Sequence, residues 1–170
     1  MARNSYLVRA AQEADFGAIA RIYAHAVLHG TATFEVEPPD AETMRQRWAA
    51  ILDLGLPYLV AEREGAVIGY AYASAYRPRP AYRFTIEDSI YVDAQYTGRG
   101  CGCALLGELL AICAKGPWQQ MVAVIGDSAN VGSVRLHERF GFRHVGALRA
   151  VGFKFEKWVD TVLMQKALHE

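Results

Sequence analysis

The chain of 170 residues is 52% hydrophobic and 21% charged, which predicts one globular domain over residues 1–170 and excludes a disordered or fibrous protein. Lys plus Arg and Asp plus Glu number 18 each, so no net charge attracts nucleic acid or an acidic membrane. The apolar runs are too short to span a bilayer, and the N-terminus lacks a signal-peptide pattern. The odd number of cysteines, 3, indicates reduced thiols in the cytoplasm, and no His or Cys spacing predicts a metal site.

The first half of the chain switches between strand-like and helical apolar patterns. Asp15 and Asp40 each stand where a side chain can cap the start of a helix. Glu64-Gly65 separates two strand-like runs and predicts a hairpin. The elements expected here are a strand over 6–10, a helix after Asp15, a loop over 29–39, a helix from 40 to about 52, and strands over 58–62 and 67–76.

The second half is arranged around a central strand over 84–92, which follows a basic loop broken by prolines. Residues 119–125 are nearly all apolar, which predicts a strand buried on both faces. The other expected elements are a helix from about Cys101, a helix over 130–140 closed by Gly141, and strands over 143–151 and 158–165. This order predicts an α/β fold in which one mixed sheet of about seven strands carries helices on both faces.

Three glycines, Gly98, Gly100 and Gly102, separate the central strand from the helix that follows. Glycine lets the backbone approach an anion closely, and the free N–H groups of a helix start can bind it, so this turn predicts a pyrophosphate site. The turn is not a P-loop, because Cys103 rather than Lys follows Gly102, and a dinucleotide fingerprint would need glycine at 103. Taken alone, the stretch is equally compatible with an ordinary glycine turn.

A polar stripe marks the helix over 130–140. Asn130, Ser133 and His137 share one helical face and could meet a pantetheine arm and a thiol. A solvated helix face is the alternative, and Asn130 is also explained as a helix cap.

Two motifs resemble, in order and spacing, the cofactor motifs of the GNAT N-acetyltransferase superfamily: Gln95-x-x-Gly98-x-Gly100 and Asn130-x-x-Ser133-x-x-x-His137. The segments HAVLHGTATFE, PAYRFTIEDSIYV, MVAVIGDSAN, VRLHERFGF and LRAVGFKF are similar to its phosphinothricin and methionine sulfoximine acetyltransferase branch, from about residue 7 to 167. The resemblance implies acetyl-CoA as co-substrate and no metal. It implies acetyl-CoA contacts from Ile90, Tyr91, Val92, Gln95, Gly98, Arg99, Gly100, Cys101, Gly102, Asn130, Ser133 and His137.

Glu87 is the candidate general base, because it lies on the polar parity of the central strand and matches the proposed base of the family. Burial would raise its pKa and suit it to that task. Asp88 has the opposite parity and should point away, unless the strand bulges as in the family. His137 either protonates the departing thiolate or only binds acetyl-CoA. The resemblance implies that backbone N–H groups of residues 90–92 stabilise the oxyanion.

The resemblance places the acceptor pocket before the central strand. Arg79 and Tyr82 match residues that hold the acceptor, together with Glu87, and Phe34 is a candidate pocket wall. Pro80 replaces a polar residue of the phosphinothricin enzymes, which leaves the acceptor's identity open. Lys154 matches a branch feature whose role is unknown, and the thiols of Cys101 and Cys103 are expected to pack.

The sequence therefore predicts a cytoplasmic N-acetyltransferase that moves acetyl directly, in a ternary complex, to a small amino-acid-like amine. Phosphinothricin, methionine sulfoximine and methionine sulfone are the leading acceptors, and the resemblance implies a homodimer. The alternatives are acetylation of another amine, such as a polyamine or a peptide N-terminus, and a non-catalytic sensor of acyl-CoA.

Overall fold

The computed structural model describes residues 6–169, so the predicted single domain over 1–170 extends beyond the described part at both ends. Helices and strands follow one another in the predicted order. The helices are α1 (Phe16–His29), α2 (Ala41–Asp53), α3 (Cys101–Cys113) and α4 (Val131–Arg139). The strands are β1 (Leu7–Ala10), β2 (Tyr58–Arg63), β3 (Ala66–Ala75), β4 (Thr85–Val92), β5 (Gln120–Gly126), β6 (Arg143–Lys154) and β7 (Lys157–Ala167). No helix within residues 6–169 is long and apolar enough to cross a membrane.

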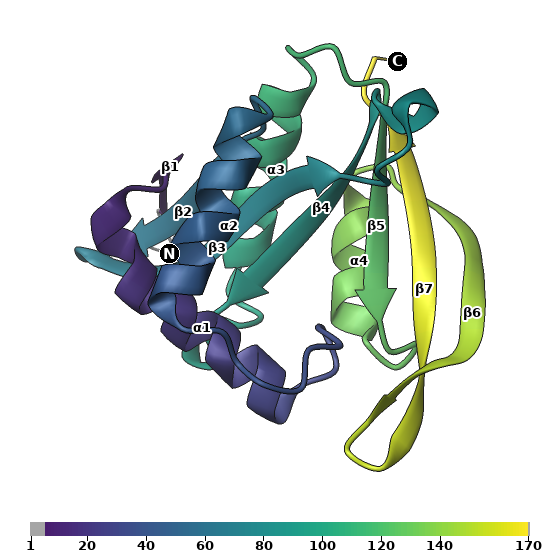
Figure 1. Ribbon diagram of the computed structural model, residues 1–170, viewed down its shortest axis with the longest axis horizontal. Coiled ribbons are helices and arrows are strands. Elements are labelled where there is room, and N and C mark those ends of the chain that lie inside the picture. Colours follow the sequence, from purple (N-terminus) through teal and green to yellow (C-terminus); the bar gives the residue numbers. More distant parts are fainter. Residues whose placement is uncertain (1–5, 170) are drawn as a thin grey trace.

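The strands form one 7-stranded sheet in the order β1-β2-β3-β4-β5-β7-β6. β4 and β5 pair in parallel, whereas the other neighbouring strands pair antiparallel, so the predicted mixed sheet is confirmed. Helices α1 and α2 cover one face of the sheet and α3 and α4 the other (Figure 1).

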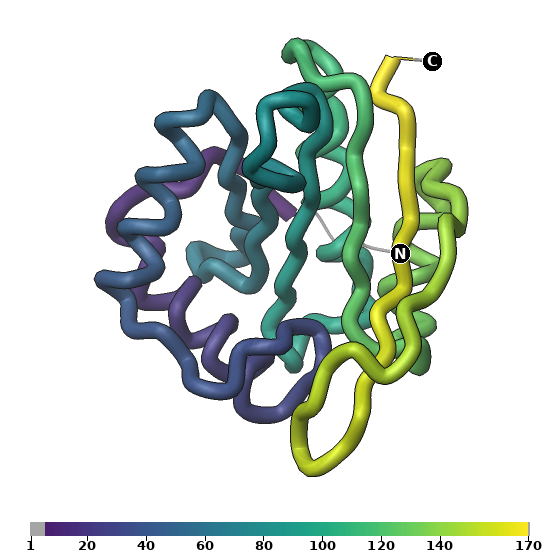
Figure 2. The backbone as a smooth tube through the Cα atoms, turned by 45° about the vertical axis from the view of Figure 1, so that its right-hand side comes forward, coloured from purple at the N-terminus to yellow at the C-terminus, as the bar shows by residue number. Residues whose placement is uncertain are grey.

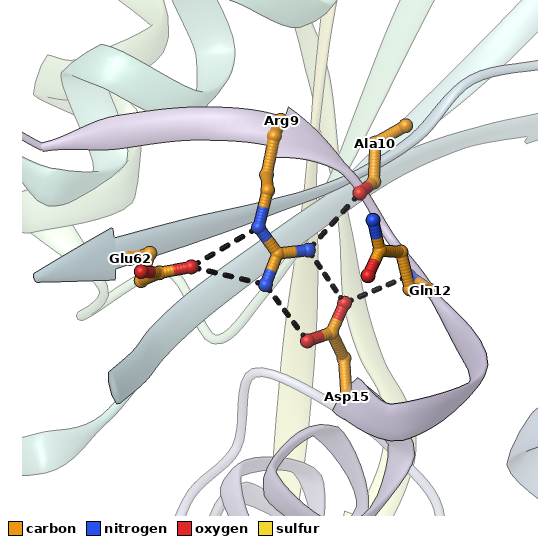
Figure 3. A network of polar contacts seen from close by, with 5 residues as sticks. All are labelled: Arg9, Ala10, Gln12, Asp15 and Glu62. Carbon is orange, nitrogen blue, oxygen red and sulfur yellow. Dashed lines mark hydrogen bonds and ion pairs between the residues drawn. The ribbon is translucent and has the colours of Figure 1, made fainter. Parts of the chain in front are cut away.

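The two predicted helix caps differ in outcome. Asp40 caps α2 as expected, since its Oδ1 accepts a hydrogen bond from the N–H of Thr43 at 2.8 Å. Asp15 precedes α1, but the prediction that its side chain caps that helix is wrong. Its carboxylate instead accepts two hydrogen bonds from Arg9, at 2.8 and 2.9 Å. Arg9 also donates to Glu62, so the network ties β1 to β2 and to the start of α1 (Figure 3).

The prediction that β5 is buried on both faces is wrong. Met121, Ala123 and Ile125 are buried, but Val122 is half-buried and Val124 is 38% exposed. An apolar sequence cannot distinguish a side chain that packs on a helix from one that borders a hollow. The open face of β5 is therefore a feature that only the assembled sheet reveals.

Strands β4 and β5 separate along their length. Their pairing runs from Thr85–Gln120 to Asp88–Ala123, while β4 continues to Val92 and β5 to Gly126. Beyond Asp88 the two strands diverge, and α4 lies behind the gap between them (Figure 1). Each strand keeps its outer partner, β3 or β7, so the sheet opens at one point in its middle.

The loop between α1 and α2 lies beside the tip of the β6–β7 hairpin (Figure 2). Lys154 makes this contact, since its Nζ donates to the carbonyl oxygens of Gly30 and Thr33 at 2.7 and 2.8 Å. Burial lowers the pKa of Lys154, and the nearby Glu35 opposes that shift. Lys154, for which the sequence predicted no role, therefore anchors the loop that carries Phe34.

Candidate active site

The gap between β4 and β5 is the mouth of a cavity of about 640 Å³, a size typical of small-molecule sites. Its walls come from the ends of both strands, the glycine turn before α3 and one side of α4. Predicted residues that line it are Ile90, Tyr91, Val92, Gly98, Gly100, Gly102, Asn130, Ser133 and His137. Two motifs distant in sequence therefore meet at one cavity.

The glycine turn adopts a backbone that glycine favours. Gly98 and Gly100 have φ angles of 71° and 90°, in the left-handed region that favours glycine, and α3 begins at Cys101. The N–H groups of the first turn of α3 therefore lie beside the cavity, with the positive end of the helix dipole. The hydroxyl of Tyr6 donates to the carbonyl oxygen of Arg99 at 2.7 Å and braces the turn.

Three predicted contact residues of this turn do not line the cavity with their side chains: Gln95, Arg99 and Cys101. Cys101 is buried in the core, as expected of a packing thiol, and only its backbone belongs to the helix start. Cys103, also expected to pack, is half-buried and lines the cavity instead.

The backbone of β4 offers hydrogen-bond groups to the gap at alternate residues. The N–H of Asp93 donates to the carbonyl oxygen of Ile68 at 2.8 Å, and the N–H of Tyr76 donates to that of Thr85 at 3.3 Å. These two bonds show which residues of β4 form backbone hydrogen bonds with β3. Because antiparallel hydrogen bonds alternate, Tyr91 bonds to β3, whereas Ile90 and Val92 point away from it. Of the three residues predicted to donate N–H groups, two therefore face the gap.

His137 lies on α4 and is buried, at 3% exposure. Its Nδ1 lies 2.7 Å from the carbonyl oxygen of Ser133, and its Nε2 lies 2.9 Å from Oδ2 of Asp88. Burial disfavours the charge on His137, but the bonds to Asp88 and Ser133 outweigh it and raise the pKa. Asn130 accepts from the N–H of Ser133 at 3.2 Å, so its predicted role as a helix cap is confirmed.

Asp88 is a cavity residue that the sequence did not single out. As its parity predicts, it lies on the opposite face of β4 from Glu87, and the β3–β4 register shows no bulge; on that face it lines the cavity. The signal was present in the sequence, since Asp88 shares the parity of Ile86 and Ile90. A carboxylate at a core-facing position needs a buried partner, and His137 is that partner.

Glu87 projects from β4 on the face covered by α1 and α2, away from His137. Burial raises the pKa of Glu87 from 4.5 to about 7; the charge of Asp88 adds to the shift and that of Arg77 opposes it. A carboxylate poised near neutrality can accept a proton from an amine at physiological pH. The two candidate catalytic residues therefore flank one strand from opposite sides.

The predicted acceptor residues come from two loops. Arg79 and Tyr82 lie at the exposed 3₁₀ turn Pro80–Tyr82 between β3 and β4, where Pro80 occupies the first position. The ring of Tyr82 packs on Tyr76 at 5.6 Å. Phe34, on the α1–α2 loop, is 39% exposed.

The cavity fits an acyl-CoA. The turn at Gly98 and Gly100 with the start of α3 can seat a pyrophosphate, and the free edges of β4 and β5 can pair with the amide groups of a pantetheine arm. Lining residues that the sequence did not single out include Thr97, Val124, Arg135, Leu136 and Arg139. Nothing in their local pattern distinguishes them from ordinary surface or core residues.

An open mixed sheet with a gap between two parallel strands, a glycine turn and a helix start beside it defines an acyl-CoA-binding fold. Residues 8–142 match the acetyltransferase (GNAT) family, and the chain belongs to that family. The resemblance drawn from the two motifs is thereby confirmed.

Similar proteins include members of the branch seen in the sequence. The chain is 54% identical over 169 residues to the phosphinothricin N-acetyltransferase of Alcaligenes faecalis, covering 99% of this chain and 86% of the relative. It is 38% identical over 163 residues to an L-methionine sulfoximine/L-methionine sulfone acetyltransferase of Salmonella typhimurium, covering 96% and 95%. A GNAT superfamily phosphinothricin acetyltransferase from Sinorhizobium meliloti, crystallised with AcCoA, superimposes with a TM-score of 0.94 at 47% identity, covering 97% of this chain and 89% of that one.

Proposed function

We propose that this protein transfers an acetyl group from acetyl-CoA directly to the amino group of a small amino-acid-like acceptor. The observation that carries the proposal is the gap between β4 and β5, which has the acyl-CoA cavity on one side of the sheet and Glu87 on the other. A thioester in the gap is reachable from both faces, so acetyl-CoA and an amine can meet there without a covalent enzyme intermediate.

In this proposal Glu87 is the general base. Its carboxylate takes a proton from the acceptor's ammonium, directly or through water, because only the neutral amine attacks a thioester. The N–H groups of Ile90 and Val92 face the gap and would stabilise the negative charge that develops on the carbonyl oxygen. Asn130, Ser133 and the glycine turn hold the rest of acetyl-CoA.

The acceptor is an amino acid with a phosphinyl, sulfoximine or sulfone group, as the names of the similar enzymes suggest. Arg79, at the exposed turn before β4, offers a guanidinium fork that suits a carboxylate or phosphinate. Tyr82 and Phe34 would wall the pocket on either side. The exposed basic loop that carries Arg79 argues against a polyamine.

The test is CoA thiol release from acetyl-CoA with a panel of amines. The panel contains phosphinothricin, methionine sulfoximine, methionine sulfone, several ordinary amino acids, spermidine and a short peptide. We expect turnover of the phosphinyl and sulfonyl compounds and little with spermidine. Turnover of spermidine or the peptide would show that the acceptor is a polyamine or a peptide N-terminus and not an amino-acid-like compound. Tight acetyl-CoA binding without any turnover would favour a sensor, although the poised Glu87 argues against one.

We also propose that the protein works as a homodimer in the cytoplasm. The β6–β7 hairpin exposes a row of large apolar side chains, among them Phe153 at 58% and Trp158 at 70% exposure. Such a patch is typical of a protein interface. Cys101, Cys103 and Cys113 are all free thiols, as a reducing compartment permits.

A further inference from the structure

Both ring nitrogens of His137 face oxygen acceptors. The carbonyl oxygen of Ser133 can only accept a hydrogen bond, so Nδ1, at 2.7 Å, carries a proton. A carboxylate of Asp88 also only accepts, so Nε2, at 2.9 Å, carries the second proton. The geometry therefore describes an imidazolium beside a carboxylate, in which the carbonyl oxygen of Ser133 and Oδ2 of Asp88 take the two ring protons, and the hydroxyl of Ser133 lies 3.5 Å from Nδ1.

The pair is shut away from solvent. The side chains of His137 and Asp88 are 4% and 2% exposed, and the ring of Phe142 packs edge-on against His137 at 4.9 Å. The other oxygen of Asp88, Oδ1, is buried without a hydrogen-bond partner among the described residues. A buried carboxylate in this setting depends on its cation, because a single unpaired charge is strongly disfavoured there.

The position of the pair matters more than its strength. Asp88 is the last residue of β4 that pairs with β5, opposite Ala123, and the gap begins directly after it. His137 belongs to α4, the helix that follows β5 and forms another wall of the cavity. The Asp88–His137 contact thus joins two walls of the cavity at the apex of the gap.

We propose that Asp88 and His137 form a buried ion pair that sets the width of the β4–β5 gap, so that His137 positions the thioester and does not protonate the departing thiolate. The inference rests on the proposed acetyl transfer and concerns the same site. It makes Asp88 and His137 positioning residues. The pH dependence of the chemistry then belongs to Glu87 on the other face.

The proton balance of the reaction closes without His137. The ammonium of the acceptor gives one proton to Glu87 and attacks as a neutral amine, forming the C–N bond as the C–S bond breaks. The nitrogen then loses a second proton, which the CoA sulfur can take directly or through water. A thiol ionises far more readily than an alcohol, so the CoA sulfur can depart as a thiolate. The products are the N-acetyl compound and CoA thiol, with one proton released from Glu87.

The first test is the protonation state of the ring. In protein labelled with ¹⁵N-histidine, the His137 signals are assigned by their loss in His137→Gln and recorded at pH 7 without ligand. We expect protons on both ring nitrogens, and their conversion to a singly protonated ring in Asp88→Asn. A singly protonated ring in the wild-type protein at pH 7 would overturn the ion pair.

The second test separates positioning from acid catalysis. CoA affinity is measured by calorimetry and kcat by thiol release for His137→Gln, Asp88→Asn and the double variant. We expect each single variant to bind CoA more weakly, by up to about 10²-fold, and the double variant to recover part of the loss because no unpaired charge remains. A loss of kcat by 10²-fold or more in both variants that lack His137, with CoA affinity unchanged, would assign acid catalysis to it.

His144→Gln is the matched control, because His144 makes an exposed contact to Glu138 at 3.5 Å and lies outside the cavity. It should change neither CoA affinity nor kcat. The ring protonation and the calorimetry need no acceptor, so they still test the ion pair if the proposed acetyl transfer fails.

Discussion

Glu87 and Asp88 are adjacent carboxylates with different surroundings. Glu87 is half-buried; burial and the neighbouring charge of Asp88 raise its pKa to about 7, against the opposing charge of Arg77. Asp88 has an imidazole at 2.9 Å. Because side chains alternate along a strand, Glu87 and Asp88 face opposite sides of the sheet, and in the proposed mechanism these are the acceptor side and the acetyl-CoA side.

The variant Glu87→Gln tests the proposed base. We expect kcat to fall by roughly 10²- to 10⁴-fold, since a general base contributes about that much, while acetyl-CoA affinity stays the same. In the wild-type protein kcat should rise as the pH passes through about 7, where Glu87 loses its proton, and the variant should lack this limb. The measurement is a kcat profile from pH 5 to 9, with exposed Glu108→Gln as the control. A variant with wild-type kcat at every pH would remove Glu87 from the mechanism.

Glu87→Gln, which should lower kcat, should raise the stability of the folded protein at high pH. A carboxyl group with a raised pKa binds its proton more tightly in the folded than in the unfolded chain, so stability falls as the pH rises from 4.5 through about 7. Glu87→Gln should therefore melt above the wild type at pH 8 and match it below pH 4.5. Melting curves at both pH values measure the burial of Glu87 independently of catalysis.

The sequence predicted individual residues well where the cause is local. Asp40 as a cap and left-handed Gly98 and Gly100 follow from a few neighbouring residues. The role of Asp15 depends on Arg9, which reaches it from the neighbouring strand, and the partner of Asp88 is His137, which is distant in the sequence. Parity gave the correct face for Asp88 but could not say what lies opposite it.

At the scale of single elements, we propose that the glycine turn and the start of α3 together bind the pyrophosphate of acetyl-CoA. Gly100 is left-handed, with φ of 90°, so any other side chain there strains the turn. Gly100→Ala should weaken acetyl-CoA binding modestly through this strain. Gly100→Glu should abolish it, because a negative charge would then lie at the pyrophosphate. Calorimetry with acetyl-CoA measures both variants. The control is Gly17→Glu, on α1, where an added Cβ meets nothing within 4 Å.

The β6–β7 hairpin packs against Phe34, the proposed wall of the acceptor pocket. A Cβ added at Gly152 would collide with the Phe34 ring, whereas a Cβ at Gly146 on the same strand meets nothing within 4 Å. Gly152→Ala should displace the ring and raise the acceptor KM several-fold, with less effect on the KM of acetyl-CoA. Gly146→Ala should leave both constants unchanged. If Gly152→Ala and Gly146→Ala changed the acceptor KM and the acetyl-CoA KM to the same extent, Phe34 would not belong to the acceptor pocket.

Element boundaries were predictable to within a few residues because periodicity is a local property. The helix expected over 130–140 is observed as Val131–Arg139, and the strand over 143–151 extends to Lys154. The divergence of β4 from β5 was not predictable, because a strand pattern records which face is apolar and not where its neighbour stops pairing.

At the scale of the whole molecule, Arg9 ties the first strand to Glu62 of β2 and to Asp15 at the start of α1 (Figure 3). The hydrogen bond from Arg9 lowers the pKa of Asp15 despite burial. A lowered carboxyl pKa contributes stability above the unfolded value of about 4, and this contribution is lost as the pH falls through the folded value. Asp15→Asn should therefore destabilise the protein by about 1–3 kcal/mol at pH 7, and less as the pH falls below 4. Urea unfolding at several pH values measures this, with exposed Asp53→Asn as the control.

The exposed apolar row of the β6–β7 hairpin bears on how copies of the whole molecule assemble. Phe153 and Trp158 pack on each other at 5.0 Å and remain largely exposed, beside Leu148, Val151 and Phe155. Burying such side chains against a second copy is favourable by about 25 cal/mol per Å² of apolar surface.

We expect light scattering to give twice the chain mass of 18.8 kDa for the wild type. Trp158→Asp should shift the mass toward one chain, since a charge at the centre of an apolar interface is strongly disfavoured. Leu54→Asp, at a site 60% exposed after α2, should keep the dimer. Because the same hairpin holds the Phe34 loop through Lys154, the monomeric variant should also show a raised acceptor KM. A monomeric variant with an unchanged KM would mean that assembly and acceptor binding are independent.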